Sequence, residues 1–292
     1  MGISRRTFLK SSAVAAMAMG ITTLPTAHSG SIAPPHQGKV IDCHAHLTHR
    51  NRPSWETEDR KLIEAADKLG IDLLCCSILT PQRPAAPAAF RECNDWTADA
   101  MKRFAGRVLG YCYVNPGYGL ESLDEIRRCV EGRGFIGIKL YNEHTCTDPV
   151  VFPIVELAIE LRVPILHHAS HSHYFVEDQP RMSDGGHLAE LARRYPEAML
   201  ICGHICGGGD WEWTIKALRN APSVLLDTSG SVTDDGTMEM AAAVLGAERL
   251  VFGCDMSMTA GMGRIRAADL SKKDKEKILG GNMMGLLRRR NG

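Results

Sequence analysis

Histidines and one aspartate stand at the ends of several apolar runs in this 292-residue chain. The first run ends in Asp42-Cys43-His44-Ala45-His46, where His44 and His46 share one face of an extended strand because side chains alternate. Two imidazoles at this spacing can bind one metal ion, although a pair of solvent-facing histidines has the same spacing. Later apolar runs end at His167-His168, His204 and Asp255. This concentration of ligand-type residues predicts a metal centre.

Eight short apolar runs position these residues, and none of them alternates with a period of two. Such runs are typical of strands buried on both faces of a parallel sheet. We expect strands at 40–44, 71–79, 108–114, 135–141, 163–168, 199–203, 224–227 and 250–253. Segments with charged faces lie between them, and we expect helices at 55–69, 90–104, 120–131, 150–161, 186–195, 211–219, 237–245 and 272–288. Eight strands, each followed by a helix, in about 250 residues predict one α/β domain, a (β/α)8 TIM barrel.

A doubly wound open sheet is the competing arrangement. It requires a glycine-rich phosphate-binding turn after the first strand, and the sequence has none there. Gly207-Gly208-Gly209 follows the sixth expected strand and lacks the spacing of that turn. In a TIM barrel the active site lies at the carboxyl ends of the strands, where the histidines and Asp255 stand. The sequence therefore favours a barrel with its site at the C-terminal mouth.

The composition is that of a soluble globular protein. Lys and Arg total 34, as do Asp and Glu, so no excess of basic residues points to nucleic acid as a partner. A hydrophobic fraction of 44% excludes a disordered chain. One run of small and apolar residues, 11–24, is too short to cross a bilayer, and we expect no stable membrane span in the mature form.

The N-terminus carries a basic segment, Ser-Arg-Arg-Thr-Phe-Leu-Lys at 4–10, ahead of the uncharged run. This order predicts a removable signal peptide, and the paired arginines followed by Phe and Leu resemble the twin-arginine export signal. We expect signal and linker at 1–33, with cleavage between Ala27 and Ala33, and the barrel at 34–292. The resemblance implies the twin-arginine export machinery as a partner. It also implies that the protein reaches the periplasm or the exterior already folded.

The ten cysteines fit the same export route. Exported proteins usually use their cysteines in disulfides, whereas many of these cysteines lie inside apolar runs. Small thiols in such runs are typical of core packing. We therefore expect buried thiols, in a protein that folds in the reducing cytoplasm before export.

Seven segments of the chain together form a specific pattern. They are Val40-Ile41-Asp42-Cys43-His44-Ala45-His46, Gly137-Ile138-Lys139-Leu140, Pro164-Ile165-Leu166-His167-His168, Gly203-His204, Leu226-Asp227-Thr228-Ser229-Gly230, Phe252-Gly253-Cys254-Asp255 and Ile278-Leu279-Gly280-Gly281-Asn282. From about residue 40 to 287 the chain thereby resembles the amidohydrolase superfamily, in the amidohydrolase-related branch that includes aminocarboxymuconate-semialdehyde decarboxylase. The resemblance implies a distorted TIM barrel with one or two divalent ions, most commonly zinc.

The resemblance also implies roles for individual residues. The metal ligands would be His44, His46, His168 and Asp255. Asp255 would also transfer protons as a catalytic residue. His204 would be the second catalytic residue, which either polarises the substrate or holds a second metal.

Two of these positions have alternatives. His167 competes with His168, because both faces of their strand are apolar, and the spacing from Pro164 in the family favours His168. Lys139 has three interpretations, namely a carbamylated bridge between two metals, a cation that binds a substrate carboxylate, and a rim lysine without a role. We expect Lys139 to be a substrate-binding residue.

The ligand types suit hydrolysis. Three neutral imidazoles and one carboxylate leave a divalent ion able to lower the pKa of water to about 7. Asp255 can take the proton while the activated water attacks a carbonyl, and the metal or His204 can stabilise the oxyanion. We therefore expect a metal-dependent hydrolase of an amide, lactone or ester bond in a small molecule. A non-oxidative decarboxylase of a small carboxylic acid is the first alternative, and a non-catalytic metal-binding barrel is the second. The substrate and the oligomeric state stay open.

Overall fold

Eight parallel strands form one sheet, and their order in the sheet follows their order in the sequence. The computed structural model describes residues 38–172, 177, 179–205 and 207–290. The strands are β1 (Ile41–His46), β2 (Leu73–Ser77), β3 (Val108–Tyr113), β4 (Gly137–Leu140), β5 (Ile165–His167), β6 (Leu200–Cys202), β7 (Val224–Asp227) and β8 (Leu250–Val251). All eight expected strands are present. The predicted signal peptide and its cleavage site lie outside the described residues.

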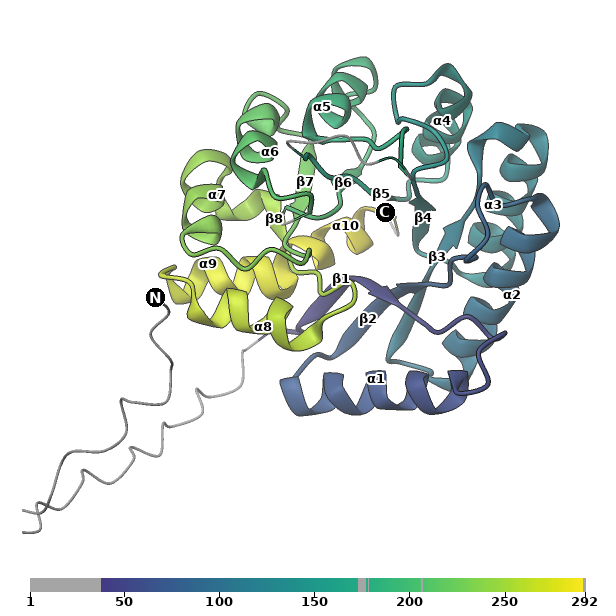
Figure 1. The fold of residues 1–292 in the computed structure, drawn as a ribbon, viewed down its shortest axis with the longest axis horizontal. Helices are drawn as coiled ribbons and strands as arrows, with labels where there is room; N and C mark the ends of the chain where they lie inside the picture. The colour runs from purple at the N-terminus through teal and green to yellow at the C-terminus, as the bar shows by residue number, and fades with distance from the viewer. Residues whose placement is uncertain (1–37, 173–176, 178, 206, 291–292) are drawn as a thin grey trace, which may run out of the picture. The chain divides into compact units, whose positions relative to one another are not determined.

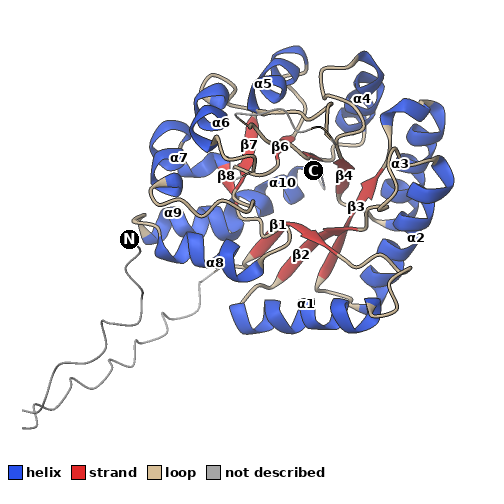
Figure 2. Cartoon of the chain, in the orientation of Figure 1, coloured by secondary structure: helices blue, strands red, loops and turns tan. Residues whose placement is uncertain are grey.

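Helices surround the strands, so the fold is the expected TIM barrel (Figure 1, Figure 2). They are α1 (Trp55–Leu69), α2 (Pro87–Arg103), α3 (Leu120–Arg133), α4 (Phe152–Glu160), α5 (Gly185–Arg194), α6 (Trp211–Leu218), α7 (Thr237–Leu245), α8 (Met258–Ala267), α9 (Lys272–Glu276) and α10 (Asn282–Arg290). The α8 helix is not among the helices expected from the sequence. The single helix expected at 272–288 is divided into α9, a π-helical turn at Lys277–Gly281, and α10.

Hydrogen bonds between β1 and the segment directly after β8 bring the two ends of the sheet together. The backbone N–H of Cys43 donates to the carbonyl oxygen of Phe252 at 2.8 Å, and the N–H of Asp255 donates to that of His44 at 2.6 Å. Because both bonds lie beyond the end of β8, closure of the barrel also places Asp255 beside the histidine-bearing end of β1.

The part of the barrel interior toward the N-terminal ends of the strands is a packed apolar core. Ile41, Cys43, Cys75, Tyr111 and Ile201 form an inner cluster with other strand residues, and Met283 and Leu286 of α10 belong to the same cluster. The nine described cysteines are all buried free thiols. The α10 helix thus plugs the N-terminal end of the barrel, and polar side chains gather at the C-terminal mouth. None of the described helices is long and apolar enough to cross a membrane.

Asp184 begins α5 and holds two histidines near the mouth. Its Oδ1 accepts the backbone N–H of His187 at 3.0 Å, and its Oδ2 lies 3.1 Å from Nδ1 of His171. Burial raises the pKa of Asp184, but the hydrogen bonds from the side chain and N–H of His187 and from His171 outweigh it and lower the pKa to about 2. The ionised carboxylate therefore stabilises this part of the fold.

Replacing Asp184 with Asn removes the charge and keeps a side chain that can cap a helix. Because the folded-state pKa lies below the ordinary value of 3.8, the ionised group stabilises the protein above that pH, and the contribution is lost as pH falls toward 2. We expect Asp184→Asn to lower the free energy of unfolding by about 1 to 2 kcal/mol near neutral pH and by progressively less below about pH 4. Urea unfolding at several pH values measures this, with Glu190→Gln on the same helix as the control. A difference that does not shrink in acid would contradict the assignment.

Candidate metal centre

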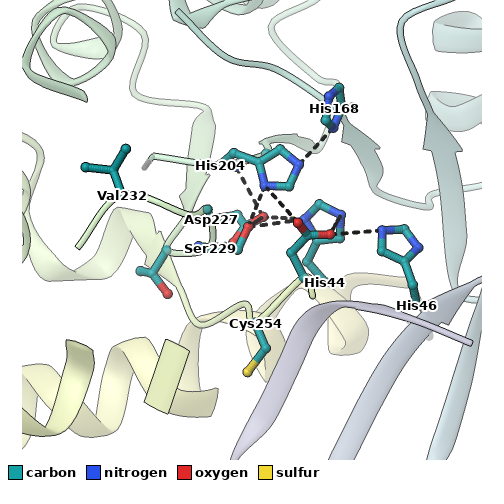
Figure 3. A network of polar contacts seen from close by, with 12 residues as sticks. His44, His46, His168, His204, Asp227, Ser229, Val232 and Cys254 are labelled. Carbon is teal, nitrogen blue, oxygen red and sulfur yellow. Dashed lines mark hydrogen bonds and ion pairs between the residues drawn. The ribbon is translucent and has the colours of Figure 1, made fainter. Parts of the chain in front are cut away.

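An irregularity in β1 turns both predicted histidines of this strand into the barrel. Cys43 belongs to the inner cluster, whereas Ala45 belongs to the core between the strands and the helices. Strict alternation would put Cys43 and Ala45 on the same side of the strand. The alternation is therefore interrupted between these two residues, where the pairing of β1 with β2 shifts register. His44 and His46 consequently face the mouth (Figure 3), the first buried and the second 15% exposed.

His44, His46 and Asp255 offer three metal-ligand atoms at one point of the mouth. The Oδ1 of Asp255 lies 3.2 Å from Nε2 of His46 and 3.9 Å from Nε2 of His44. Each pair among the three ligand atoms is closer than 4.8 Å. These three residues, which we call the donor trio, come from β1 and from the turn after β8.

The protonation states of His44 and Asp255 suit a divalent cation. Burial lowers the pKa of His44 well below its usual value, so its imidazole is neutral. Burial raises the pKa of Asp255, but the hydrogen bond from His46 and the neighbouring imidazoles outweigh it and hold this pKa well below its usual range. Neutral imidazoles and an ionised carboxylate are ligands for zinc and for other divalent transition metals. The residues present therefore fit a divalent ion.

Asp227, at the end of β7, is a buried carboxylate behind the donor trio. Its Oδ2 lies 2.6 Å from Nδ1 of His44. Ser229 donates its backbone N–H to Oδ1 at 2.7 Å and its hydroxyl to Oδ2 at 2.8 Å. Because a carboxylate only accepts hydrogen bonds, the hydrogen of His44 is on Nδ1 and the lone pair is on Nε2, the atom that faces Asp255. Asp227 thereby prepares His44 to bind a metal.

The hydroxyl of Ser229 continues this chain of hydrogen bonds to two more histidines (Figure 3). Since its hydrogen is donated to Asp227, its oxygen accepts the Nδ1 hydrogen of His204 at 2.8 Å. The free Nε2 of His204 then accepts the Nδ1 hydrogen of His168, also at 2.8 Å. This leaves the lone pair of His168 on Nε2. One carboxylate thus sets the tautomers of three histidines.

The adjacent residues His167 and His168 point in opposite directions. Leu166 lies in the inner cluster, so alternation puts His168 on the inner side and His167 on the outer side. His167 is buried, its Nδ1 donates to the carbonyl oxygen of His168 at 2.8 Å, and burial lowers its pKa to about 4. His168 stacks on Tyr141 with ring centroids 4.1 Å apart. His168 therefore faces the mouth, next to His204 and outside the donor trio.

Lys139 lies on β4 and is completely buried. Its Nζ is 2.6 Å from Nε2 of His44, and burial lowers its pKa to about 8. The amine therefore donates to the nitrogen whose lone pair is available to a metal ion. Binding of an ion at that nitrogen would free the amine for another partner.

A separate group of ligand-type atoms lies between α2, β3 and α3. Cys112, Glu125 and Cys129 bring their ligand atoms within 4.8 Å of one another. The carboxylate of Glu125 already accepts hydrogen bonds from Asn94 at 2.9 Å and from Arg128 at 2.5 and 2.7 Å. Its charge is therefore balanced by protein groups, and this group is a structural ion-pair network.

Asp227 and Ser229 have no role among the expectations from the sequence, although both lie in a segment of the family resemblance. A usable signal exists in the sequence. An acid closes the apolar run 224–227, and a hydroxyl follows two residues later on the same side of an extended chain. Such a pair at the mouth of a barrel indicates a polar network behind the ligands.

The amidohydrolase family model matches residues 41–289, and the chain therefore belongs to this family. A model of the twin-arginine translocation pathway signal sequence matches residues 2–22. The protein is thus exported in folded form through the twin-arginine machinery to the periplasm or the exterior. No curated protein matches the chain.

Solved structures of similar fold cover most of the chain. The 5-carboxyvanillate decarboxylase of Sphingomonas paucimobilis has 16% identity, covers 86% of this chain and 99% of its own, and superposes with a TM-score of 0.67. The dihydroxybenzoic acid decarboxylase of Polaromonas sp. JS666, solved with manganese and an inhibitor, has 19% identity, coverage of 86% and 97%, and a TM-score of 0.65. The 4-oxalomesaconate hydratase of Rhodopseudomonas palustris has 18% identity, coverage of 86% and 96%, and a TM-score of 0.63. These likenesses establish the shared barrel fold.

Removing a member of the donor trio should weaken metal binding. We expect His46→Ala and Asp255→Ala each to reduce the affinity for Mn²⁺ or Zn²⁺ by more than the roughly 10- to 100-fold effect of losing an outer-shell partner. Titration of the metal-free protein with each ion measures this. His49→Gln is the matched control, because His49 packs on Trp96 near the same strand. Unchanged affinity in both alanine variants would rule out this centre.

Removing the network behind the ligands should have a smaller effect of the same kind. Asp227→Asn and Ser229→Ala are expected to weaken metal binding by roughly 10- to 100-fold, because the histidines lose the groups that set their tautomers. Ser229→Thr keeps a hydroxyl and should keep the affinity. Nitrogen-15 NMR of the imidazoles reports the tautomers directly. If Ser229→Ala leaves the tautomer of His204 as in the wild type, the relay from Asp227 is wrong.

Proposed function

We propose that this protein is a metal-dependent decarboxylase that removes carbon dioxide from a small carboxylic acid. The donor trio carries the proposal, because it offers ligands for a divalent ion at the open end of the barrel. Two of the structures of similar fold described above are decarboxylases, and one of them contains manganese. Hydrolysis, which the ligand types alone favour, has less support among these relatives.

The metal would be held by the donor trio together with His168, whose Nε2 lone pair is available. A bound divalent ion supplies positive charge that stabilises negative charge developing on the substrate. The carboxylate of Asp227 keeps the lone pair of His44 on Nε2, the atom that faces the other two members of the donor trio. The ligand positions are therefore set before the substrate binds.

Lys139, Asp255 and His204 would act on the substrate. The amine of Lys139, once released from His44, binds a substrate carboxylate. When carbon dioxide leaves, the electron pair of the broken carbon–carbon bond stays on the ring or chain carbon, and that carbon must take a proton. That proton comes from solvent. Asp255 lies 3.9 Å from Nδ1 of His204 and 3.2 Å from Nε2 of His46, so its carboxylate can pass the proton on to that carbon, with His204 beside it.

The reaction class can be read from isotopes. We expect the metal-loaded protein, given hydroxybenzoates and unsaturated acids with a ¹³C carboxyl group, to release ¹³CO₂ and to leave a product with one solvent hydrogen. The organic product should contain no ¹⁸O when the reaction is run in H₂¹⁸O. Asp255→Asn should lower kcat by at least roughly 100-fold, the usual contribution of a proton-transfer group, while His49→Gln keeps it.

Other outcomes of this experiment identify the other chemistries. Incorporation of ¹⁸O with cleavage of the substrate would show hydrolysis, and incorporation without cleavage would show hydration. Either result, without release of ¹³CO₂, would contradict the proposed decarboxylation. Full turnover by Asp255→Asn would contradict the role given to Asp255.

A further inference from the structure

A cavity of about 660 Å³ lies at the end of the barrel opposite to the donor trio. It is lined by Val40, which directly precedes β1, by Leu279 of the π-helical turn and by Met284 of α10. These residues place it at the N-terminal ends of the strands, and we call it the basal cavity. Its volume falls within the range of about 300 to 1,000 Å³ that is typical of sites for small molecules.

The backbone fixes the walls of the basal cavity. A Cβ at Gly280 would lie 1.8 Å from the carbonyl oxygen of Lys39, so the π-helical turn touches the chain before β1 with no side chain between them. The N–H of Phe252, directly after β8, donates to the carbonyl oxygen of Ile278 at 2.9 Å. Both contacts hold the turn against the barrel, and the cavity is therefore a preformed feature of the fold.

The buried part of the lining is apolar. Val40 and Leu279 are buried, and the partly buried Met284 packs against the inner cluster of the barrel. Such a surface favours the apolar part of a ligand, because binding removes both apolar surfaces from water.

The exposed part of the lining is positively charged. Lys39, Lys273 and Arg288 are exposed, and none of them has an acid within ion-pair distance in the described part of the chain. The lining also contains Lys277, which is paired with a neighbouring acid, and the carboxylate of Glu276. Because the whole chain has as many acids as Lys and Arg residues, this excess of positive charge is local, and it favours an anionic group.

We propose that the basal cavity is a second ligand site, which binds an organic anion with an apolar body. The apolar body would contact Val40, Leu279 and Met284, and the anionic group would face Lys273 and Arg288. This site is separate from the donor trio and takes no part in the reaction proposed above. Because the ligand contacts both the chain before β1 and α10, its binding stabilises the closed barrel.

Equilibrium binding tests the basal cavity without requiring turnover. The manganese-loaded protein is titrated calorimetrically with naphthalene-2-sulfonate and with methyl 2-naphthyl sulfone, a neutral compound of similar shape. We expect the sulfonate to bind about tenfold or more tightly than the sulfone, as one charged hydrogen-bonded pair provides. The double variant Lys273→Gln/Arg288→Gln should abolish this preference and leave binding of the sulfone unchanged. The control Arg60→Gln/Lys61→Gln, which removes two charges from the exposed surface of α1, should retain the preference.

Methionine methyl groups locate the bound ligand. Met284 lines the basal cavity, whereas Met256 follows Asp255 at the mouth and is 81% exposed. In protein labelled with ¹³C at the methionine methyl groups, we expect the sulfonate to shift the signal of Met284 and to leave that of Met256 unchanged. Met284→Leu and Met256→Leu assign the two signals.

Three results would overturn the inference. The first is a wild type that binds the sulfonate no more tightly than the sulfone. The second is a preference that the variant Lys273→Gln/Arg288→Gln keeps, or that the α1 control loses equally. The third is a shift of the Met256 signal in place of the Met284 signal, which would locate the ligand at the mouth. Loss of decarboxylation with intact binding of the sulfonate would instead disprove only the proposed function.

Discussion

The buried charge of Asp227 is the interaction on which the candidate site depends. An ionised carboxylate in a protein interior is strongly unfavourable unless hydrogen-bond donors surround it. Burial raises the pKa of Asp227, and the neighbouring His204, the two hydrogen bonds from Ser229 and the nearby Lys139 act in the opposite direction. The Nδ1 of His44 lies 2.6 Å from the same carboxylate. The bonds that keep this anion ionised are the same bonds that set the tautomers of the histidines. Stability of the anion and readiness of the metal ligands therefore have one structural cause.

The space for this anion depends on the neighbouring strand and on α8. A Cβ at Gly253 would lie 2.2 Å from Oδ1 of Asp227, so a larger residue would displace the carboxylate. Arg264 of α8 donates to three carbonyl oxygens in the segment 228–232, which contains Ser229. The α8 helix, which follows Asp255 in the sequence, thus also supports the loop that carries Ser229, and Ser229 joins Asp227 to His204 through hydrogen bonds.

Periodicity predicts the elements of this protein better than the directions of its side chains. Buried parallel strands are continuous apolar runs, and all eight are recognisable, whereas the glycines of α8 weaken its helix signal, and Gly261 packs closely on Cys254. Alternation puts His44 and His46 on one face, but their inward direction depends on an irregularity that has no mark in the sequence. The basal cavity lies between the chain before β1 and the π-helical turn, two distant segments that periodicity cannot relate.

The backbone is strained at two of the functional positions, and the same anion supports one of them. Among the described residues, the non-glycine residues with positive φ are Arg162, His204 at 65° and Asp255 at 53°. This conformation costs roughly 1 to 2 kcal/mol, and glycine would relieve it only by removing the imidazole or the carboxylate. The N–H of His204 donates to Asp227 at 3.3 Å, and that of Asp255 donates to the carbonyl oxygen of His44 at 2.6 Å. Each strained residue is thus tied to the network that it serves, so any change that loosens Asp227 should disturb the backbone at His204 as well as the tautomers.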